Sequence, residues 1–182
     1  MLSQFFSRLF ALGSFMAIGA MTAMAQAPVP AKNDLPINKR WQHVVGDWIV
    51  ICAQGHEGRK ACAMSQSLNN AKTGQTLAAM AISRDANGKT SATVTVPMGV
   101  LVNAGLRAGV NQQSSFDVPF RTCVAQGCVA QFEINGPLLK QISQAEKFSV
   151  AARTIQQQPL TIEFSLRGFA KAHEILTQEV KG

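Results

Sequence analysis

Between about residue 44 and residue 167, the sequence is a succession of short alternating apolar and polar runs separated by turn sequences. Such a succession is typical of an all-β sandwich or barrel rather than of alternating strands and helices. The Asn87-Gly88 dipeptide is the strongest turn signal, because both residues readily adopt the positive φ angles of a tight hairpin. The expected strands are residues 44–52, 61–68, 76–83, 90–96, 114–123, 128–134, 147–154 and 160–167.

Two helices are expected beside these strands. Pro137 suits a first helical turn, and the apolar residues after it predict one short helix that ends near Gln144. In the segment 168–179, apolar residues recur on one face at helical spacing. This pattern predicts a C-terminal helix that packs on the sheets as a cover.

The N-terminus has the features of a secretory signal peptide over residues 1–25. Arg8 supplies positive charge, residues 9–18 are apolar, and Ala23-Met24-Ala25 offers small residues for cleavage after Ala25. Cleavage would leave 182 − 25 = 157 residues with 16 basic and 10 acidic side chains. Residues 26–40 contain three prolines and are expected to form an extended leader before a folded domain, residues 41–182.

The four cysteines fall into two close pairs, Cys52 with Cys62 and Cys123 with Cys128. An even number of cysteines in an oxidising compartment favours disulfides, and four cysteines allow three pairings. A bridge across a longer loop would constrain the unfolded chain more. We nevertheless predict the local pairing, because each close pair brackets a turn and strands joined by a short turn place their side chains within bridging distance.

A zinc site and a redox-active dithiol are the alternative uses of these thiols. The spacings of nine and four intervening residues differ from the short knuckles of zinc sites. Redox pairs are typically Cys-x-x-Cys at the start of a helix, whereas Cys123 and Cys128 follow a strand-like run. Structural disulfides are therefore the preferred interpretation, and no metal or cofactor is expected.

Five groups of residues occur in an order that matches a known family. They are Asp47-Trp48-Ile49-Val50-Ile51-Cys52, Ala61-Cys62-Ala63-Met64-Ser65-Gln66, Val96-Pro97-Met98-Gly99-Val100 with Ala104-Gly105-Leu106, Phe120-Arg121-Thr122-Cys123 with Gly127-Cys128, and Phe164-Ser165-Leu166-Arg167-Gly168-Phe169. Over residues 41–176 the chain resembles the invasion-associated locus B family of bacterial envelope proteins. The resemblance implies an immunoglobulin-like antiparallel β-sandwich and export to the periplasm or the outer envelope surface. For founding members it also implies a part in host-cell entry, but it implies no enzyme.

Residue types that could carry a reaction are scattered along the chain. His43, His56 and His173 have no metal-ligand spacing. The sequence contains no Gly-x-Ser-x-Gly elbow, phosphate-binding glycine loop or dinucleotide fingerprint. The carboxylates that could form a catalytic pair are dispersed: Asp47, Asp85, Asp117, Glu133 and Glu163. Dispersed residues can converge in space, so an unrecognised hydrolase is kept as the third hypothesis.

Candidate partner-binding residues lie in an apolar segment with several glycines, residues 96–110. They are Met98, Val100, Leu101 and Leu106. The alternative is that these side chains fill the core at a corner between two sheets. Trp41, beside Lys39 and Arg40, is the fifth candidate, whereas Trp48 is expected in the core.

The leading functional hypothesis is an exported noncatalytic envelope protein that acts by binding. Its expected partner is an envelope component or a host-surface protein or glycan. The excess of positive charge also favours a peripheral contact with an anionic membrane surface, for example through Lys39 and Arg40. Nucleic acid is not expected, because the cationic residues form no stripe. A structural or chaperone-like accessory of envelope assembly is the alternative, and the oligomeric state is left open.

Overall fold

The structure, a computed structural model, describes residues 37–55, 58–85, 87–110 and 114–181. These residues belong to one unit, Asp34–Gly182. The expected signal peptide, residues 1–25, lies outside the described residues, as do most of the expected leader and His56.

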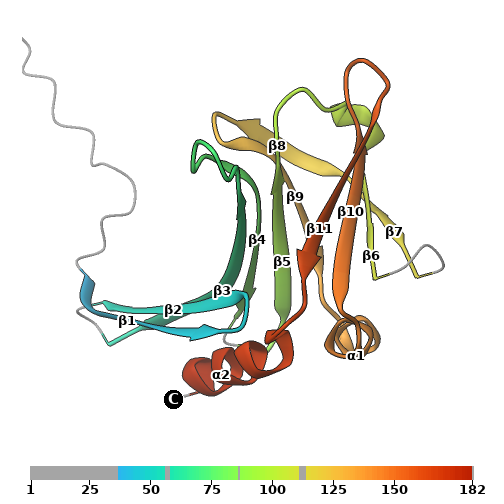
Figure 1. Cartoon of the computed structure of the whole chain (residues 1–182). Coiled ribbons are helices and arrows are strands. Elements are labelled where there is room, and N and C mark those ends of the chain that lie inside the picture. The colour runs from blue at the N-terminus through green and yellow to red at the C-terminus, as the bar shows by residue number, and fades with distance from the viewer. Residues whose placement is uncertain (1–36, 56–57, 86, 111–113, 182) are drawn as a thin grey trace, which may run out of the picture. The chain divides into compact units, whose positions relative to one another are not determined.

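The strands form two antiparallel sheets that face each other (Figure 1). The large sheet has the order β1-β2-β3-β4-β5-β9-β8. Its strands are β1 (Ile37–Val45), β2 (Trp48–Gly55), β3 (Lys60–Asn69), β4 (Thr76–Arg84), β5 (Thr90–Val96), β9 (Gly127–Glu133) and β8 (Phe120–Val124). The small sheet has the order β11-β10-β6-β7. Its strands are β11 (Pro159–Ser165), β10 (Lys147–Arg153), β6 (Leu106–Gly109) and β7 (Phe116–Val118). The expected all-β sandwich is confirmed.

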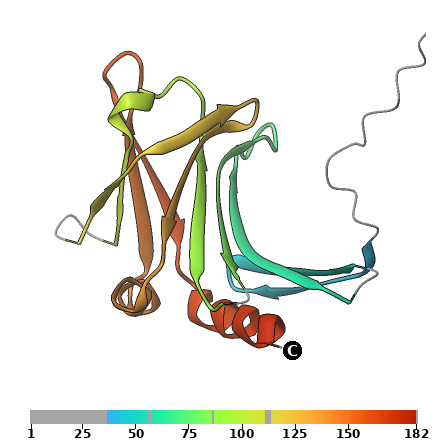
Figure 2. The ribbon, with the colours of Figure 1, turned by 180° about the vertical axis from the view of Figure 1, so that it is seen from behind.

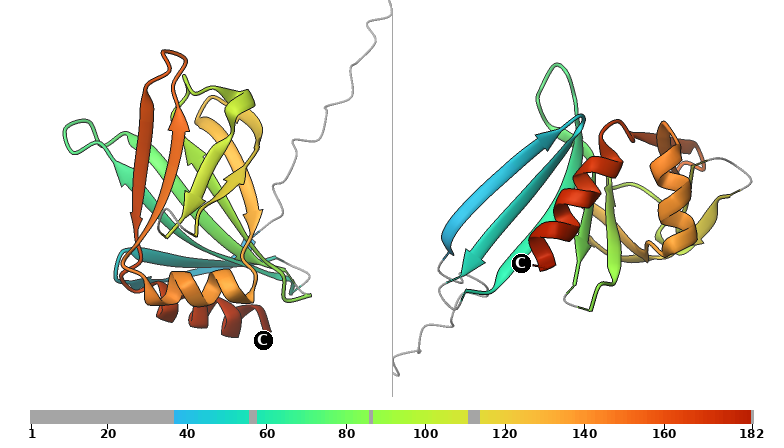
Figure 3. Two further views of the ribbon diagram at one scale, coloured as in Figure 1. Left: turned by 90° about the vertical axis from the view of Figure 1, so that its right-hand side faces the viewer. Right: turned by 90° about the horizontal axis from the view of Figure 1, so that it is seen from below.

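Two α-helices, α1 (Gly136–Gln144) and α2 (Phe169–Lys181), lie at the same end of the sandwich (Figure 3), which we call the helix end. The Asn135 side chain caps α1 by accepting a hydrogen bond from the backbone N–H of Leu138. A short 3-10 helix, Val102–Ala104, follows β5. Neither α-helix in the described part of the chain is both long and apolar enough to cross a membrane.

The core is formed by the facing sides of the two sheets and by α2. Trp48 and Phe169 are almost completely buried, and their rings meet edge to face with 5.3 Å between centroids. Ala172 and Leu176 are buried on the same side of α2. The C-terminal helix therefore covers the sheets with the apolar face that the sequence pattern predicts.

The start of the domain differs from the sequence prediction. The expected strand 44–52 is two strands, β1 and β2, because the chain turns back at residues 46–47. Gly46 has a φ of 61°, and a Cβ at this position would lie 2.4 Å from the carbonyl oxygen of Arg167. A glycine therefore permits both the turn and the close approach. Trp41 lies inside β1, so the predicted leader boundary at residue 40 falls within a strand.

The expected strand 114–123 is also divided. β7 pairs with β6 in the small sheet, whereas β8 pairs with β9 in the large sheet. The two strands are separated by Pro119, which has no backbone N–H to donate to a ladder. The chain crosses from one sheet to the other at this residue. The alternation of apolar and polar residues in the sequence does not by itself distinguish such a crossing from one continuous strand.

Candidate binding surfaces

Four connections between strands lie at the end of the sandwich opposite the helices (Figures 1 and 2). They are residues 70–75, 97–105, 125–126 and 154–158, and we call this surface the loop end. The strand registers place three of them at the same end of the large sheet, since Val96 pairs with Cys128 and Thr95 pairs with Ala79, and backbone hydrogen bonds join residues 154–158 to residues 97–105. The disulfide between Cys123 and Cys128 spans the β8–β9 hairpin beside the loop end.

Two of these connections are held against each other by backbone hydrogen bonds. Leu101 N–H donates to the Arg153 carbonyl over 2.8 Å, and Ile155 N–H donates to the Gly99 carbonyl over 2.9 Å. Val100 and Thr154 form an isolated antiparallel bridge between them. Gly105 lies close against the backbone of β7. A Cβ at residue 105 would lie 2.8 Å from the Val118 carbonyl oxygen, so the close approach requires a glycine. The connections 97–105 and 154–158 therefore have a defined backbone conformation.

The structure separates the five candidate binding residues. Met98 is 63% exposed at the loop end, and Leu101 is half-buried beside it. Val100 and Leu106 are only 5% and 2% exposed, so they belong to the core and are not available to a partner. Val100 and Leu106 thus fill the core between the two sheets, as the alternative interpretation of this segment predicts. Trp41 lies on β1, away from this segment.

Two further apolar residues are exposed at the loop end: Val102, which lies in the apolar segment 96–110 but is not one of the five candidates, and Ile155, which sequence reasoning missed. Val102 is 51% exposed and Ile155 is 60% exposed. Ile155 is the single apolar residue in the polar turn between β10 and β11. An isolated apolar residue in a polar turn is the sequence signal that could have identified it as an exposed contact residue. Because residue 155 is hydrogen-bonded to residue 99, Met98 and Ile155 lie on adjoining segments.

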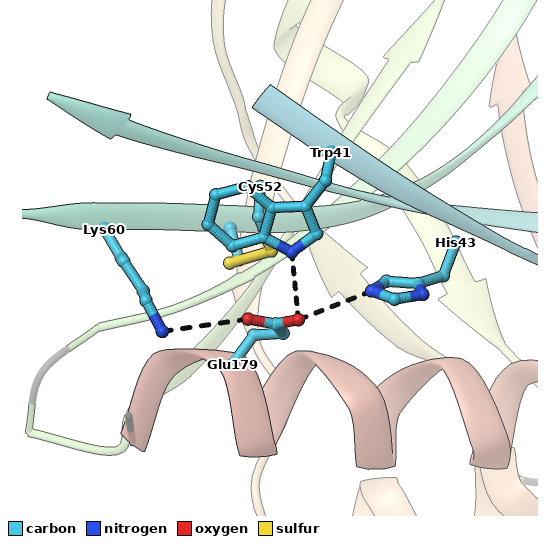
Figure 4. Close-up of a disulfide and its surroundings, with 6 residues drawn as sticks. Trp41, His43, Cys52, Lys60 and Glu179 are labelled. Carbon is cyan, nitrogen blue, oxygen red and sulfur yellow. Dashed lines mark hydrogen bonds and ion pairs between the residues drawn. A yellow bond between two sulfur atoms is a disulfide. The ribbon is translucent and has the colours of Figure 1, made fainter. Parts of the chain in front are cut away.

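Trp41 belongs to a polar cluster around Glu179, near the end of α2 (Figure 4). The indole Nε1 donates to Glu179 Oε1 over 2.9 Å, and His43 Nε2 lies 3.4 Å from the same oxygen. Lys60 Nζ is 3.9 Å from Glu179 Oε2. The Trp41 hydrogen bond, followed by the nearby His43 and Lys60, holds the pKa of Glu179 below its usual value against the opposing effect of burial. The cluster attaches α2 to β1 and β3, so Trp41 already has an intramolecular partner.

The Cys52–Cys62 disulfide lies next to this cluster (Figure 4). The two cysteines are directly opposite each other on β2 and β3, with 4.1 Å between their Cα atoms. Their sulfurs lie within 4.8 Å of a Glu179 oxygen, which is a possible metal-ligand spacing. Cysteine binds metals as the thiolate, however, and these sulfurs are bonded to each other. The structure thus contains both disulfides in the pairing that the sequence predicts.

A second polar network connects the β1–β2 turn to the end of β11. Asp47 accepts hydrogen bonds from the Ser165 hydroxyl over 2.7 Å and from Arg167 Nη2 over 2.5 Å. Arg167, and then Ser165, keep the pKa of Asp47 below its usual value. Gln66, which is buried, donates to the Asp47 and Ser165 carbonyls and accepts from the Ser165 N–H. Each contact joins elements that are distant in sequence, which gives the network a structural role.

His173 does not join an acid and a hydroxyl in the described part of the structure. Its ring stacks on Phe169 with 6.1 Å between centroids, and its Nε2 is buried without a hydrogen-bond partner. Burial, followed by the positive charge of Arg84, lowers the pKa of His173. His173 and His43 therefore occupy separate environments, one beside the core and one in the Glu179 cluster.

Comparison with known proteins assigns the chain to a family. A family description, "Invasion associated locus B (IalB) protein", matches residues 48–177, which is most of the chain. The chain belongs to the invasion associated locus B family. The predicted family membership is therefore confirmed, and the family is named for invasion rather than for a reaction.

Relatives of this family member match it over nearly its whole length. It is 27% identical over 179 residues to invasion protein B of Bartonella bacilliformis, covering 93% of this chain and 95% of that protein. It is 25% identical over 160 residues to an invasion protein B homologue of Brucella abortus, covering 87% and 88%. The crystal structure of invasion associated protein B from Bartonella henselae superposes with a TM-score of 0.69 at 25% identity. That match covers 76% of this chain and 95% of the other.

Proposed function

We propose that this family member is an exported, noncatalytic envelope protein that acts by binding, and that the loop end is its binding surface. The observation that carries the proposal is the exposure of Met98, Val102 and Ile155 on two connections that are hydrogen-bonded together. Exposed apolar side chains on a fixed backbone bind at a smaller entropic cost than side chains on a mobile loop. The contacts of Trp41 with Glu179 and of Asp47 with Arg167 instead connect parts of the fold.

Two features support export. Residues 1–25 have the sequence of a secretory signal, and both disulfides suit an oxidising compartment. The names of the relatives refer to invasion, so a partner on the bacterial envelope or on a host surface fits the family. In this proposal the protein works in the periplasm or at the outer surface.

The proposal is tested by retention of the protein on the cell envelope. Cells producing the wild-type chain are broken, and the envelope is sedimented and washed. We expect wild-type protein to stay with the envelope and the double variant Met98→Ser/Ile155→Ser to be released. The matched control is Val44→Ser, because Val44 is 67% exposed on β1, away from the loop end.

Circular dichroism and a thiol assay establish that each variant is folded and has both disulfides. Equal retention of the wild type and the loop-end variant would show that another surface binds the envelope. Release of the wild type itself on gentle washing would contradict an envelope-binding role. Amino-terminal sequencing of the recovered protein checks export separately, and Gln26 is the expected first residue.

A further inference from the structure

The charged residues of the domain are distributed unevenly. The four connections of the loop end contain no acidic residue, and Lys72 is their single charged residue. Arg153, the last residue of β10, is exposed at the same end. The acidic side chains of the described residues all lie elsewhere: Asp47, Asp85, Asp117, Glu133, Glu146, Glu163, Glu174 and Glu179. The loop end therefore presents positive charge without a compensating negative charge.

Exposed apolar residues and exposed amide residues both occur at the loop end. Met98, Val102 and Ile155 are more than half exposed and apolar. Around them the connections carry amide side chains, including those of Asn103 and Gln156, which are also exposed. Apolar side chains beside hydrogen-bonding and cationic groups match the chemistry of a lipid headgroup region, where apolar tips enter and polar groups remain at the surface.

We propose that the loop end docks on an anionic lipid surface. Met98, Val102 and Ile155 enter the headgroup region, while Lys72 and Arg153 contact lipid phosphates. This inference rests on the proposed function, because it names the partner of the same surface. Positive charge without acidic residues is complementary to anionic lipid. A second copy of the chain is a poorer occupant, since a twofold contact between loop ends would bring the like charges of Lys72 and Arg153 together.

The contact is expected to hold during washing at low salt and to be released at high salt. Three apolar side chains bury little area in a bilayer, and stable anchoring generally requires two signals, such as apolar insertion together with basic charge. The electrostatic part acts over a Debye length of about 8 Å at physiological ionic strength, so added salt should release the protein. The surface suits a peripheral protein that is concentrated at a membrane without being inserted in it.

The test uses flotation of the purified exported protein, with both disulfides formed, on vesicles of two compositions. One set contains phosphatidylcholine and phosphatidylglycerol in equal amounts, and the other contains phosphatidylcholine alone. We expect binding to the anionic vesicles that is lost at high salt, and at least tenfold weaker binding to the neutral vesicles. Removing one charge, by Lys72→Gln or Arg153→Gln, should weaken binding by about fivefold.

The apolar part is tested with Met98→Ser/Ile155→Ser, which should weaken binding by about tenfold. Two control variants separate the loop end from other surfaces. Lys140→Gln removes an exposed charge from α1, and Arg40→Gln removes one from β1. Each should change binding by less than about twofold. A loss of binding in Arg40→Gln with none in the loop-end variants would place the lipid contact on β1 and overturn the inference.

The vesicle and envelope experiments together distinguish a failure of the lipid inference from a failure of the proposed function. If wild-type protein stays on cell envelopes through Met98 and Ile155 but binds neither kind of vesicle, the partner is a protein or a glycan. The lipid inference is then wrong, and the loop end remains the binding surface. If the loop-end variants stay on envelopes as well as the wild type does, the loop end is not the envelope-binding surface, and the assignment of lipid to that surface is wrong with it.

Discussion

The loop end and the helix end of the sandwich use their side chains differently. At the helix end, Asp47 is paired with Arg167, and Glu179 is held by Trp41. At the loop end, Met98 and Ile155 are exposed although the backbone that carries them is hydrogen-bonded. The difference indicates that side chains of the helix end maintain the fold, whereas the exposed side chains of the loop end are dispensable for folding and available for binding.

The largest expected effect comes from the core contact of the helix end. Phe169→Ala removes a ring that is 1% exposed and meets Trp48 edge to face. Truncating a buried phenylalanine lowers the free energy of unfolding by about 3–5 kcal/mol. Urea denaturation followed by circular dichroism measures this loss.

The matched substitution at the loop end is Ile155→Ser. We expect it to change the free energy of unfolding by less than about 0.5 kcal/mol, because the side chain is 60% exposed. Similar losses for Phe169→Ala and Ile155→Ser would contradict the division between a structural end and a binding end.

The two disulfides give the next comparison, one beside the Glu179 cluster and one beside the loop end. In the chain-entropy account, closing about 11 and about 6 residues stabilises the fold by about 2.8 and about 2.2 kcal/mol. Replacing both cysteines of a pair by alanine should therefore cost more for Cys52 and Cys62 than for Cys123 and Cys128. Denaturant midpoints of the two double variants, measured under the same oxidising conditions, provide the test. The reverse order would show that the Cys123–Cys128 hairpin contributes more to the fold than its position suggests.

Gln66→Leu tests the buried polar network. The substitution leaves the Ser165 N–H and the Asp47 carbonyl without the partners that Gln66 provides. The Ser165 carbonyl keeps its hydrogen bond from Trp48. We expect a loss of about 2 kcal/mol in the free energy of unfolding, because buried groups become unsatisfied. Gln178→Leu on the exposed face of α2 is the control, and an equal loss in both variants would exclude a special role for the network.

Among the substitutions that remove a contact of the fold, Trp41→Phe is expected to have the smallest effect, about 1 kcal/mol in the free energy of unfolding at neutral pH, because it removes one partly buried hydrogen bond to Glu179. The pKa of Glu179 in the folded state is lowered from 4.5. This stabilisation is therefore present above pH 4.5 and is lost as the pH falls through the folded-state pKa. Unfolding measured between neutral pH and acid should show a shallower acid loss in Trp41→Phe than in the wild type. Parallel curves would mean that Glu179 does not contribute in this way.

Much of the fold is predictable from the sequence because its signals are local. The turn at Asn87-Gly88, the first turn at Pro137 and the apolar face of α2 each occupy a few neighbouring residues, and the structure contains all three features. The division at Pro119 is different, since the strands on its two sides choose different sheets through distant partners. A local pattern carries no information about that choice.

The candidate site was harder to predict for the same reason. Val100 and Met98 are two residues apart in an apolar segment, yet one is buried and the other exposed. The backbone bends between them at Gly99, which has a φ of 88°, and residues 99–101 pair with residues 153–155. Ile155 joins the loop end only through that pairing. Glu179 meets Trp41 across 138 positions of the sequence, and no spacing rule connects them.

Site-specific photocrosslinking in living cells tests the loop end most directly as a contact surface. A photoreactive diazirine residue replaces Ile155 in one strain and Val44 in another, and both positions are exposed and apolar in the wild type. After illumination, mass spectrometry identifies the lipid or protein adducts of the recovered chain. The account predicts reproducible envelope adducts at position 155 and few at position 44. Adducts at position 44 with none at position 155 would contradict it.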